Sequence, residues 1–211
     1  ADKGAPGVTT AATALAAVWP RHVLLAECDP AGGDLVYRLP AEDGGVLNPA
    51  RGLLSLGATA RRGLSPHQIT EHTQKLVGGL DVLVGIATAE QAAGLTWLWE
   101  PLGLALDAMP GMDVLADCGR LGSYPGIYDL IAQAPLTVLF TRPRLDQVAH
   151  MRERFVALGR TLAERGKKAQ LGVAVIAEQK EYGRALGEIR RVMSAAGMPE
   201  AVLGGLAYDV K

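Results

Sequence analysis

Short apolar runs alternate along this sequence with longer amphipathic or Ala-rich segments. Continuous apolar runs bounded by turn residues are typical of strands that are buried on both faces of a parallel sheet. The runs predict strands at His22–Cys28, Asp81–Gly85, Asp113–Cys118, Leu136–Thr141, Gln170–Ala177 and Ala201–Leu206.

The segments between these runs carry helical spacing and helix start and stop signals. They predict helices at Thr9–Val18, Gly52–Arg62, Ser65–Gln74, Glu90–Met109, Pro125–Ala134, Leu145–Arg165 and Tyr182–Ala196. Alternation of this kind predicts an α/β fold: a single domain over residues 1–211, doubly wound, with a mostly parallel sheet and helices on both faces. Such sheets bind ligands at the carboxyl ends of their strands, so the loops after Ala26, Ala116 and Phe140 are the first places to search.

The composition is that of a folded protein, but it does not indicate a binding partner. The chain has 211 residues, of which 49% are hydrophobic and 20% charged. These values exclude disordered, collagen-like and coiled-coil chains. The net charge of −1 gives no overall field that favours nucleic acid or a membrane. Two cysteines cannot form a disulfide framework, which favours a reducing, cytoplasmic setting, and no apolar run is long enough to span a bilayer.

Charge is nevertheless uneven along the chain. Residues 142–191 carry twelve basic and six acidic side chains, a local net charge of +6. Two interpretations are open, a solvated basic helix face or a patch for an acidic partner such as DNA.

Three segments could carry chemistry. The first, Lys3–Thr10 (KGAPGVTT), combines glycines, threonines and a helix start, where backbone N–H groups and the helix dipole favour phosphate. The second, Glu27–Asp34 (ECDPAGGD), follows a buried strand and places Asp29 where a carboxylate can hold Mg²⁺ or orient water. The third, Asp113–Arg120 (DVLADCGR), delivers Asp117 at a strand end. Taken singly, each also fits a structural turn in which Gly or Asp satisfies local backbone.

Together, in this order, the segments resemble the MinD/ParA group of P-loop ATPases. Lys3–Thr10 aligns with the group's deviant phosphate motif K-G-G-x-G-K-T-T, and Glu27–Pro30 with its D-x-D-P segment. The resemblance implies catalytic roles for Lys3, as the signature lysine, and for Asp29, as the water-orienting carboxylate. It implies bound ATP with Mg²⁺, the metal being held by Thr9, Asp29 and Asp117. The implied nucleotide-binding residues are Gly4, Ala5, Pro6, Gly7, Val8, Thr9, Thr10, Arg142, Pro143, Tyr208 and Asp209.

The sequence departs from the group's pattern at informative positions. Val8 stands where the group has the lysine that neutralises phosphate, and no charge-assisted contact is available from valine. Pro6 has no N–H to donate, Asp2 adds negative charge, and Ala207 replaces a proline of the base-pocket loop. By the same resemblance, a first strand and a C-terminal helix are expected beyond the two ends of this sequence.

Two functions from different classes follow. The first is an ATP-dependent homodimerising switch in the cytoplasm that positions a protein cargo or partner complex, with weak ATPase activity at most. The second is a catalytically inactive scaffold that recruits or localises another assembly. By resemblance to DNA-binding ParA proteins, six basic residues are candidates for non-specific DNA contact: Arg152, Arg154, Arg160, Arg165, Lys167 and Lys168.

Overall fold

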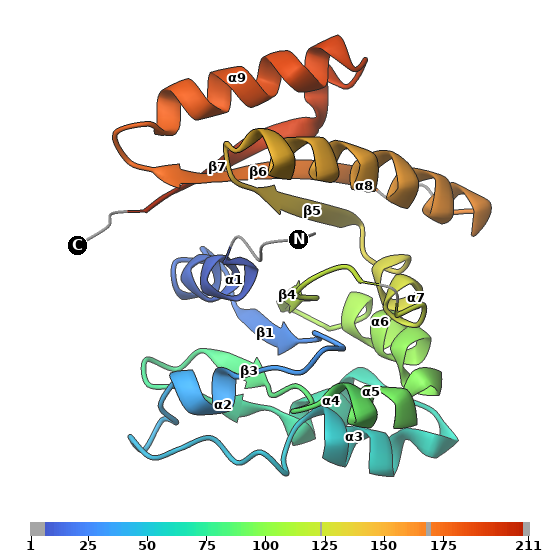
Figure 1. Cartoon of the computed structure of the whole chain (residues 1–211). Coiled ribbons are helices and arrows are strands. Elements are labelled where there is room, and N and C mark those ends of the chain that lie inside the picture. Colours follow the sequence, from blue (N-terminus) through green and yellow to red (C-terminus); the bar gives the residue numbers. More distant parts are fainter. Residues whose placement is uncertain (1–6, 123, 168–169, 209–211) are drawn as a thin grey trace. The chain divides into compact units, whose positions relative to one another are not determined.

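The computed structural model describes residues 7–122, 124–167 and 170–208. The chain forms two compact units, one spanning Thr9–Gln133 and the other made of the segment from Ala134 onward together with the described residues before Thr9. Each unit is a sheet with helices packed on it, mostly parallel in the first unit and parallel in the second (Figure 1). The predicted α/β class is therefore confirmed, whereas the single domain over residues 1–211 concerns how the units join and stays a prediction.

The sheet of the first unit has the strand order β2-β3-β1-β4. β1 (Val23–Glu27) lies between β3 (Asp81–Leu83) and β4 (Asp113–Asp117) and runs parallel to both, while β2 (Gln74–Lys75) is an antiparallel edge strand. All five residues of β1 are buried, as its continuous apolar pattern predicts. The parallel pairing brings the carboxyl ends of β1 and β4 together.

The helices of this unit pack in two groups. α1 and α2 contribute Ala16 and Leu35 to a core cluster with Val23 and Leu25 of β1. In the second group, α3 packs on α4, α4 on α6 and α6 on α7. The helical elements are α1 (Val8–Ala17), α2 (Leu35–Arg38), α3 (Leu53–Thr59), η1 (Ala60–Arg62), α4 (Pro66–His72), α5 (Ala89–Gly94), η2 (Thr96–Leu98), α6 (Trp99–Asp107) and α7 (Ile127–Ile131).

The long helix predicted over Glu90–Met109 is wrong, because the structure divides it into α5, η2 and α6. α5 ends at Gly94, and Leu95 leaves the helical region with φ −115° and ψ 21°. Pro101 is the third residue of α6. Because proline has no N–H and clashes with the carbonyl four residues before it, Pro101 is tolerated only in a first turn, which forces a new helix to begin just upstream.

The second unit is a three-stranded parallel sheet of order β5-β6-β7. Its strands are β5 (Leu136–Thr141), β6 (Gln170–Glu178) and β7 (Val202–Tyr208), and its helical elements are α8 (Leu145–Glu164), α9 (Tyr182–Ala195) and η3 (Pro199–Ala201). Since α8 and α9 each connect neighbouring parallel strands in sequence order, right-handed crossovers place both on the same face of the sheet (Figure 1). Within the described residues, no helix combines the length and apolar character needed to cross a membrane.

Candidate functional site

Part of the predicted site falls outside the described residues: Lys3, Gly4, Ala5, Pro6 and Asp209. The described remainder of the predicted phosphate loop runs directly into α1. Gly7 has a φ of +91°, in the region that favours glycine, and α1 begins at the next residue, Val8. The predicted turn-to-helix transition is therefore present.

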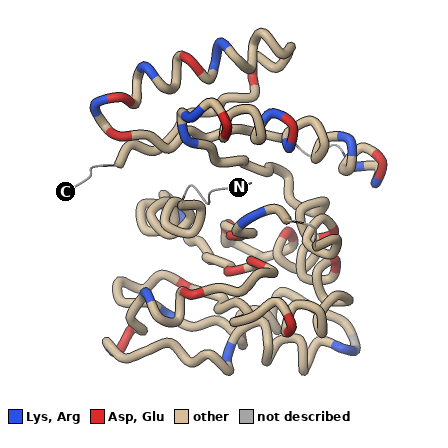
Figure 2. The backbone as a smooth tube through the Cα atoms, in the orientation of Figure 1, with Lys and Arg blue, Asp and Glu red and all other residues tan. Residues whose placement is uncertain are grey.

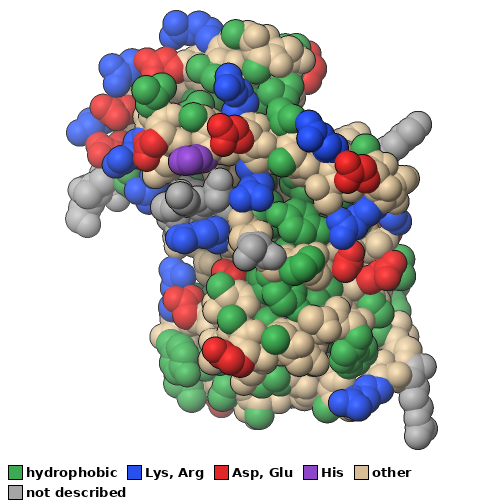
Figure 3. Space-filling model, turned by 45° about the vertical axis from the view of Figure 1, so that its right-hand side comes forward, with side chains coloured by type: hydrophobic (Ala, Val, Ile, Leu, Met, Phe, Trp, Pro, Cys, Tyr) green, Lys and Arg blue, Asp and Glu red, His purple; other side chains and the backbone are tan. Residues whose placement is uncertain are grey.

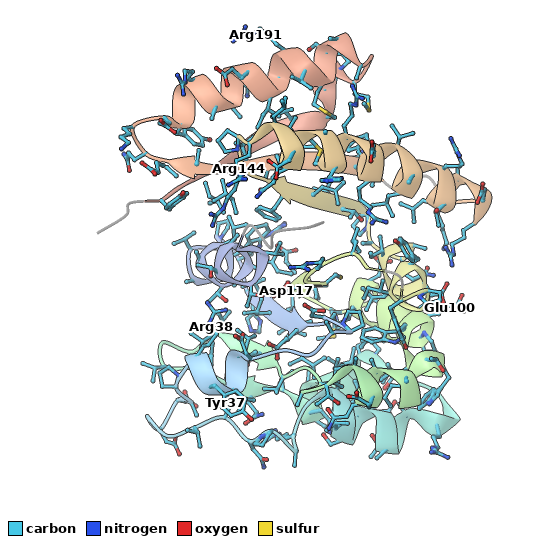
Figure 4. The ribbon with its side chains drawn as sticks, viewed as in Figure 1. Tyr37, Arg38, Glu100, Asp117, Arg144 and Arg191 are labelled. Atoms are coloured by element: carbon cyan, nitrogen blue, oxygen red, sulfur yellow. The ribbon has the colours of Figure 1, made fainter. Side chains whose placement is uncertain are left out.

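The first turn of α1 is tied to α2. Thr10, which is exposed, accepts a hydrogen bond through its Oγ1 from the Arg38 guanidinium at 3.0 Å. Arg38, labelled in Figure 4, also pairs with Asp34 at 3.4 Å. Thr9 is half-buried, and its carbonyl accepts a hydrogen bond from the Thr13 hydroxyl. The hydroxyl of Thr10 is thus engaged by Arg38, and the role of the Thr9 hydroxyl as a metal ligand stays a prediction.

Asp29 and Asp117 are brought to the same edge of the first sheet. Glu27 pairs in register with Asp117, and the next N–H along, that of Cys28, donates to the Asp117 carbonyl at 2.7 Å. Asp117 (Figure 4) is only 2% exposed, and its Oδ1 accepts the Gly119 N–H at 2.9 Å. Burial raises the pKa of Asp29, and the negative charge of Asp117 raises it further. The predicted proximity of the two carboxylates follows from parallel pairing.

The Asp29 carboxylate is held by main-chain groups on two sides. Its Oδ1 accepts the Ala31 N–H at 2.8 Å, an Asx turn, and the backbone N–H of Arg120 also donates to the carboxylate. A Cβ placed on Gly119 would lie 1.7 Å from Asp29 Oδ2. Gly119 is therefore required where the loop after β4 passes the carboxylate.

Glu27 is a functional candidate that the sequence reasoning did not assign. The residue is 3% exposed at the end of β1, and its two carboxylate oxygens accept main-chain N–H groups from Leu35 at 3.0 Å and Gly85 at 2.9 Å. Burial raises the pKa of Glu27, and these hydrogen bonds oppose that rise. A glutamate inside an otherwise apolar buried strand was the available signal, because acidic residues are almost never fully buried without a partner.

The donor set at this edge fits Mg²⁺. Among the residues that the structure describes, no group of three or more His, Cys, Asp and Glu side chains is arranged to hold a metal ion. Mg²⁺ differs from Zn²⁺ here, since it keeps several waters and takes one or two carboxylates plus substrate phosphates. Asp29 and Asp117 supply that number of carboxylates, with Thr9 as the predicted hydroxyl donor.

Thiolate chemistry is disfavoured at the same edge. Cys28 is completely buried, and desolvation raises the pKa of its thiol well above the ordinary value. Burial, and then the charge of Asp117, raise the pKa of Cys118 to about 12. Both thiols remain protonated at neutral pH, so neither is activated as a nucleophile.

The residues predicted to line a base pocket lie in the second unit. Arg142 follows β5 directly, next to the half-buried Pro143, and its guanidinium carbon lies 5.5 Å from the centre of the Tyr208 ring at the end of β7. Arg142 Nε is buried without a hydrogen-bond partner among the described residues. The structure therefore brings Arg142 and Tyr208 together as a cation–π pair.

The predicted basic cluster divides between two sides of α8. Arg152 and Arg160 line one groove with Val156 and Met198, whereas Arg154 projects from the other side of the helix and is half-buried. Acidic side chains are interleaved with the basic ones along α8 and α9 (Figures 2 and 3). The described part of the cluster is a mixed surface, and Lys168 lies outside the described residues.

Comparison with known proteins gives matches in structure only. No protein-family model matches the sequence, and no curated protein matches it either. A ParA family ATPase from Chlorobium tepidum TLS has a TM-score of 0.66 at 16% identity, covering 98% of this chain and 80% of that one. McdA from Cyanothece, a variant in complex with ATP, has a TM-score of 0.63 at 16% identity, covering 97% and 80%. Cobyrinic acid a,c-diamide synthase from Mycobacterium smegmatis, with bound ADP and magnesium, has a TM-score of 0.63 at 18% identity, covering 92% and 79%.

These matches cover 92–98% of this chain. MinD from Aquifex aeolicus is a further match, covering 98% of this chain. The chain therefore has the fold of the ParA and MinD ATPases, and the resemblance predicted from its motifs is confirmed at the level of fold.

Proposed function

We propose that this chain binds ATP with Mg²⁺ and dimerises around the nucleotide as a switch that positions a protein cargo or partner complex. The observation that carries the proposal is the convergence of Asp29 and Asp117 at the carboxyl ends of β1 and β4. Ligands of doubly wound sheets bind at that edge. Solved structures of the same fold, described by their names as an ATP complex and an ADP–magnesium complex, support it.

In this proposal the described residues have separate roles at the phosphates of the nucleotide. Thr9, at the start of α1, would hold Mg²⁺ together with Asp29 and Asp117, and the ion would supply positive charge toward the phosphates. Asp29 orients the attacking water. Backbone N–H groups at the start of α1 face the phosphates.

Titration calorimetry with Mg·ATP and Mg·GTP tests the proposal. Val8→Lys restores the lysine position, and we expect at least about tenfold tighter ATP binding, because a charge-assisted phosphate contact adds about 1.4 kcal/mol or more. Val18→Lys is the matched control, since Val18 is 76% exposed just beyond the other end of α1. Absence of ATP binding by both the natural chain and Val8→Lys would contradict a nucleotide site.

Dimerisation is a separate element of the switch. Light scattering after size-exclusion chromatography should show a doubled mass with Mg·ATP and the single-chain mass with Mg·ADP. The same mass with both nucleotides would contradict nucleotide-dependent dimerisation but not nucleotide binding.

The second candidate is the inactive scaffold, and the hydrogen bonds of Asp29 favour it. That carboxylate is already held by the backbone N–H groups of Ala31 and Arg120, as a structural turn requires. Val8 removes the phosphate-neutralising lysine as well. ATP binding that appears only in Val8→Lys, and not in the natural chain, would support the scaffold.

We also propose that the basic residues of the second unit contact DNA. The salt dependence of binding tests this proposal. Binding by Arg152, Arg160 and their neighbours would weaken steeply as salt rises, because counterions are released from each neutralised phosphate. Fluorescence anisotropy of a labelled random-sequence duplex at 50 and 200 mM salt measures that slope. Binding that is absent, or independent of salt, would exclude this partner.

A further inference from the structure

The strand that carries the candidate site ends in a buried carboxylate to which the proposed chemistry assigns no role. Glu27 is 3% exposed, and none of the ion pairs among the described residues includes it. Its charge is instead met by main-chain dipoles: Oε1 accepts the Leu35 N–H and Oε2 accepts the Gly85 N–H, at 3.0 and 2.9 Å. Burying a charge costs free energy unless hydrogen bonds satisfy it, and the described hydrogen bonds to this carboxylate come from the backbone.

The two N–H groups belong to different loops. Leu35 is the first residue of α2, so its N–H has no partner within the helix, and it closes the loop that begins with Asp29. Gly85 follows β3. One carboxylate therefore ties the far end of the Asp29 loop to the exit of the neighbouring strand.

Two glycines pack closely against Glu27, with no room for a side chain at either position. A Cβ on Gly33 would lie 2.0 Å from Glu27 Cδ, and a Cβ on Gly85 would lie 2.7 Å from the Glu27 carbonyl oxygen. The Gly33 N–H donates to the Ile86 carbonyl at 2.7 Å, which adds a second tie between the same two loops. Glycine at these positions lets the loops close directly over the glutamate.

We propose that Glu27 is a positioning residue for Asp29. Its carboxylate fixes the loop over residues 29–34 by holding the Leu35 and Gly85 N–H groups, and so sets where the Asp29 carboxylate lies relative to Asp117. The inference rests on the proposed function, because Asp29 needs a fixed position only if it serves a bound Mg²⁺ nucleotide. Glutamine cannot replace the glutamate, since its amide NH₂ would face one of the two N–H donors.

Glu27→Gln tests the inference, with Asp81→Asn as the matched control. Asp81 is also a buried carboxylate on this sheet, 8% exposed, but it lies at the opposite ends of the strands and pairs with His22 and Lys75. Amide hydrogen exchange measured by NMR without nucleotide reports the contacts themselves. We expect Leu35 and Gly85 to exchange at least tenfold faster in Glu27→Gln and to be unchanged in Asp81→Asn.

The functional readout is the ratio of ATP affinities measured with Mg²⁺ and with a chelator, which a general loss of stability would not change selectively. We expect a ratio of at least tenfold in the natural chain and in Asp81→Asn, and a ratio near one in Glu27→Gln. Faster exchange with an unchanged ratio, or no change in either, would overturn the positioning role. A natural chain that binds no ATP would overturn the proposed function, and with it this role, before any variant is measured.

Gly33→Ala provides a second route if Glu27→Gln does not fold. Its added Cβ displaces the Glu27 carboxylate from the same N–H groups while leaving the charge in place. We expect the same loss of Mg²⁺ dependence from it. A Gly33→Ala protein that keeps the natural ratio would contradict the inference independently.

Discussion

Gly119 offers a sharp test of how the Asp29 carboxylate is held. Its φ is +55°, and an added Cβ would lie 1.7 Å from Asp29 Oδ2. Gly119→Ala therefore introduces two separate penalties: the left-handed backbone conformation of a non-glycine residue, and displacement of a carboxylate that accepts the Ala31 N–H at 2.8 Å.

The chain contains a control that carries the first penalty alone. Gly111, in the loop before β4, has a φ of +66° and no atom within 4 Å of an added Cβ. The backbone penalty is about 1–2 kcal/mol for either alanine. A hydrogen bond to a charged group contributes about 1.5–3 kcal/mol when buried, and since Asp29 is half-exposed we expect about 1–2 kcal/mol here. Gly119→Ala should thus lower the free energy of unfolding by about 1–2 kcal/mol more than Gly111→Ala.

Urea unfolding followed by tryptophan fluorescence measures this difference. The three tryptophans are Trp19, Trp97 and Trp99, and all of them lie in the unit that contains both glycines. Their emission therefore reports that unit by itself. If the two variants agree within about 0.5 kcal/mol, the usual limit of additivity at such sites, then Asp29 moves aside freely and the loop after β4 does not hold it.

Three further predictions concern Asp29, Glu27 and the Arg142–Tyr208 pair. Asp29→Ala should abolish phosphate release and bring the ratio of ATP affinities measured with Mg²⁺ and with a chelator near one, as in Glu27→Gln, which a phosphate assay and calorimetry measure together; unchanged release would remove the water-orienting role. Burial raises the pKa of Glu27 above its ordinary 4.5, so the folded chain binds this proton more tightly than the unfolded chain does. The resulting stability is present below pH 4.5 and is lost as pH rises through the raised pKa, and urea unfolding between pH 4 and 7 should show a shallower decline in Glu27→Gln. Arg142→Ala should lower the melting temperature of the unit that contains Tyr208 by removing a cation–π contact of about 0.5–1 kcal/mol, whereas Arg144→Ala, with its exposed side chain, should leave it unchanged by circular dichroism.

Strands and long amphipathic helices could be predicted from the sequence because burial gives a strand a continuous apolar run and gives a helix apolar residues at helical spacing. β5 has the predicted bounds, Leu136–Thr141, and α8 ends one residue before the predicted Arg165. α2 and β2 were not predicted, since four and two residues are too short to show a period. The apolar residues of Glu90–Met109 do show helical spacing, but the break before Pro101 is decided by a missing N–H and not by hydrophobicity.

The sequence predicted only those site residues whose positions follow from where the parallel strands end. Asp29 and Asp117 come together because parallel strands present their carboxyl ends at one edge, which a sequence can predict. Glu27 was missed because its partners are the N–H groups of Leu35 and Gly85, and main-chain donors leave no signature in the identity of the residue. The roles of Lys3 and of residues 4–6 stay predictions, as they lie outside the described residues.

The way these carboxylates are satisfied bears directly on what must bind beside them. Asp117 raises the pKa of both Glu27 and Asp29, so three negative charges act on one another at this edge. Their described hydrogen-bond partners are backbone N–H groups, which stabilise a carboxylate without cancelling its charge. Val8 supplies no cation at the start of α1, and the phosphates of a nucleotide would add further negative charge. A divalent cation therefore has to enter with the nucleotide, and ATP binding by this chain should depend on Mg²⁺ more strictly than binding by a phosphate loop that carries its own lysine.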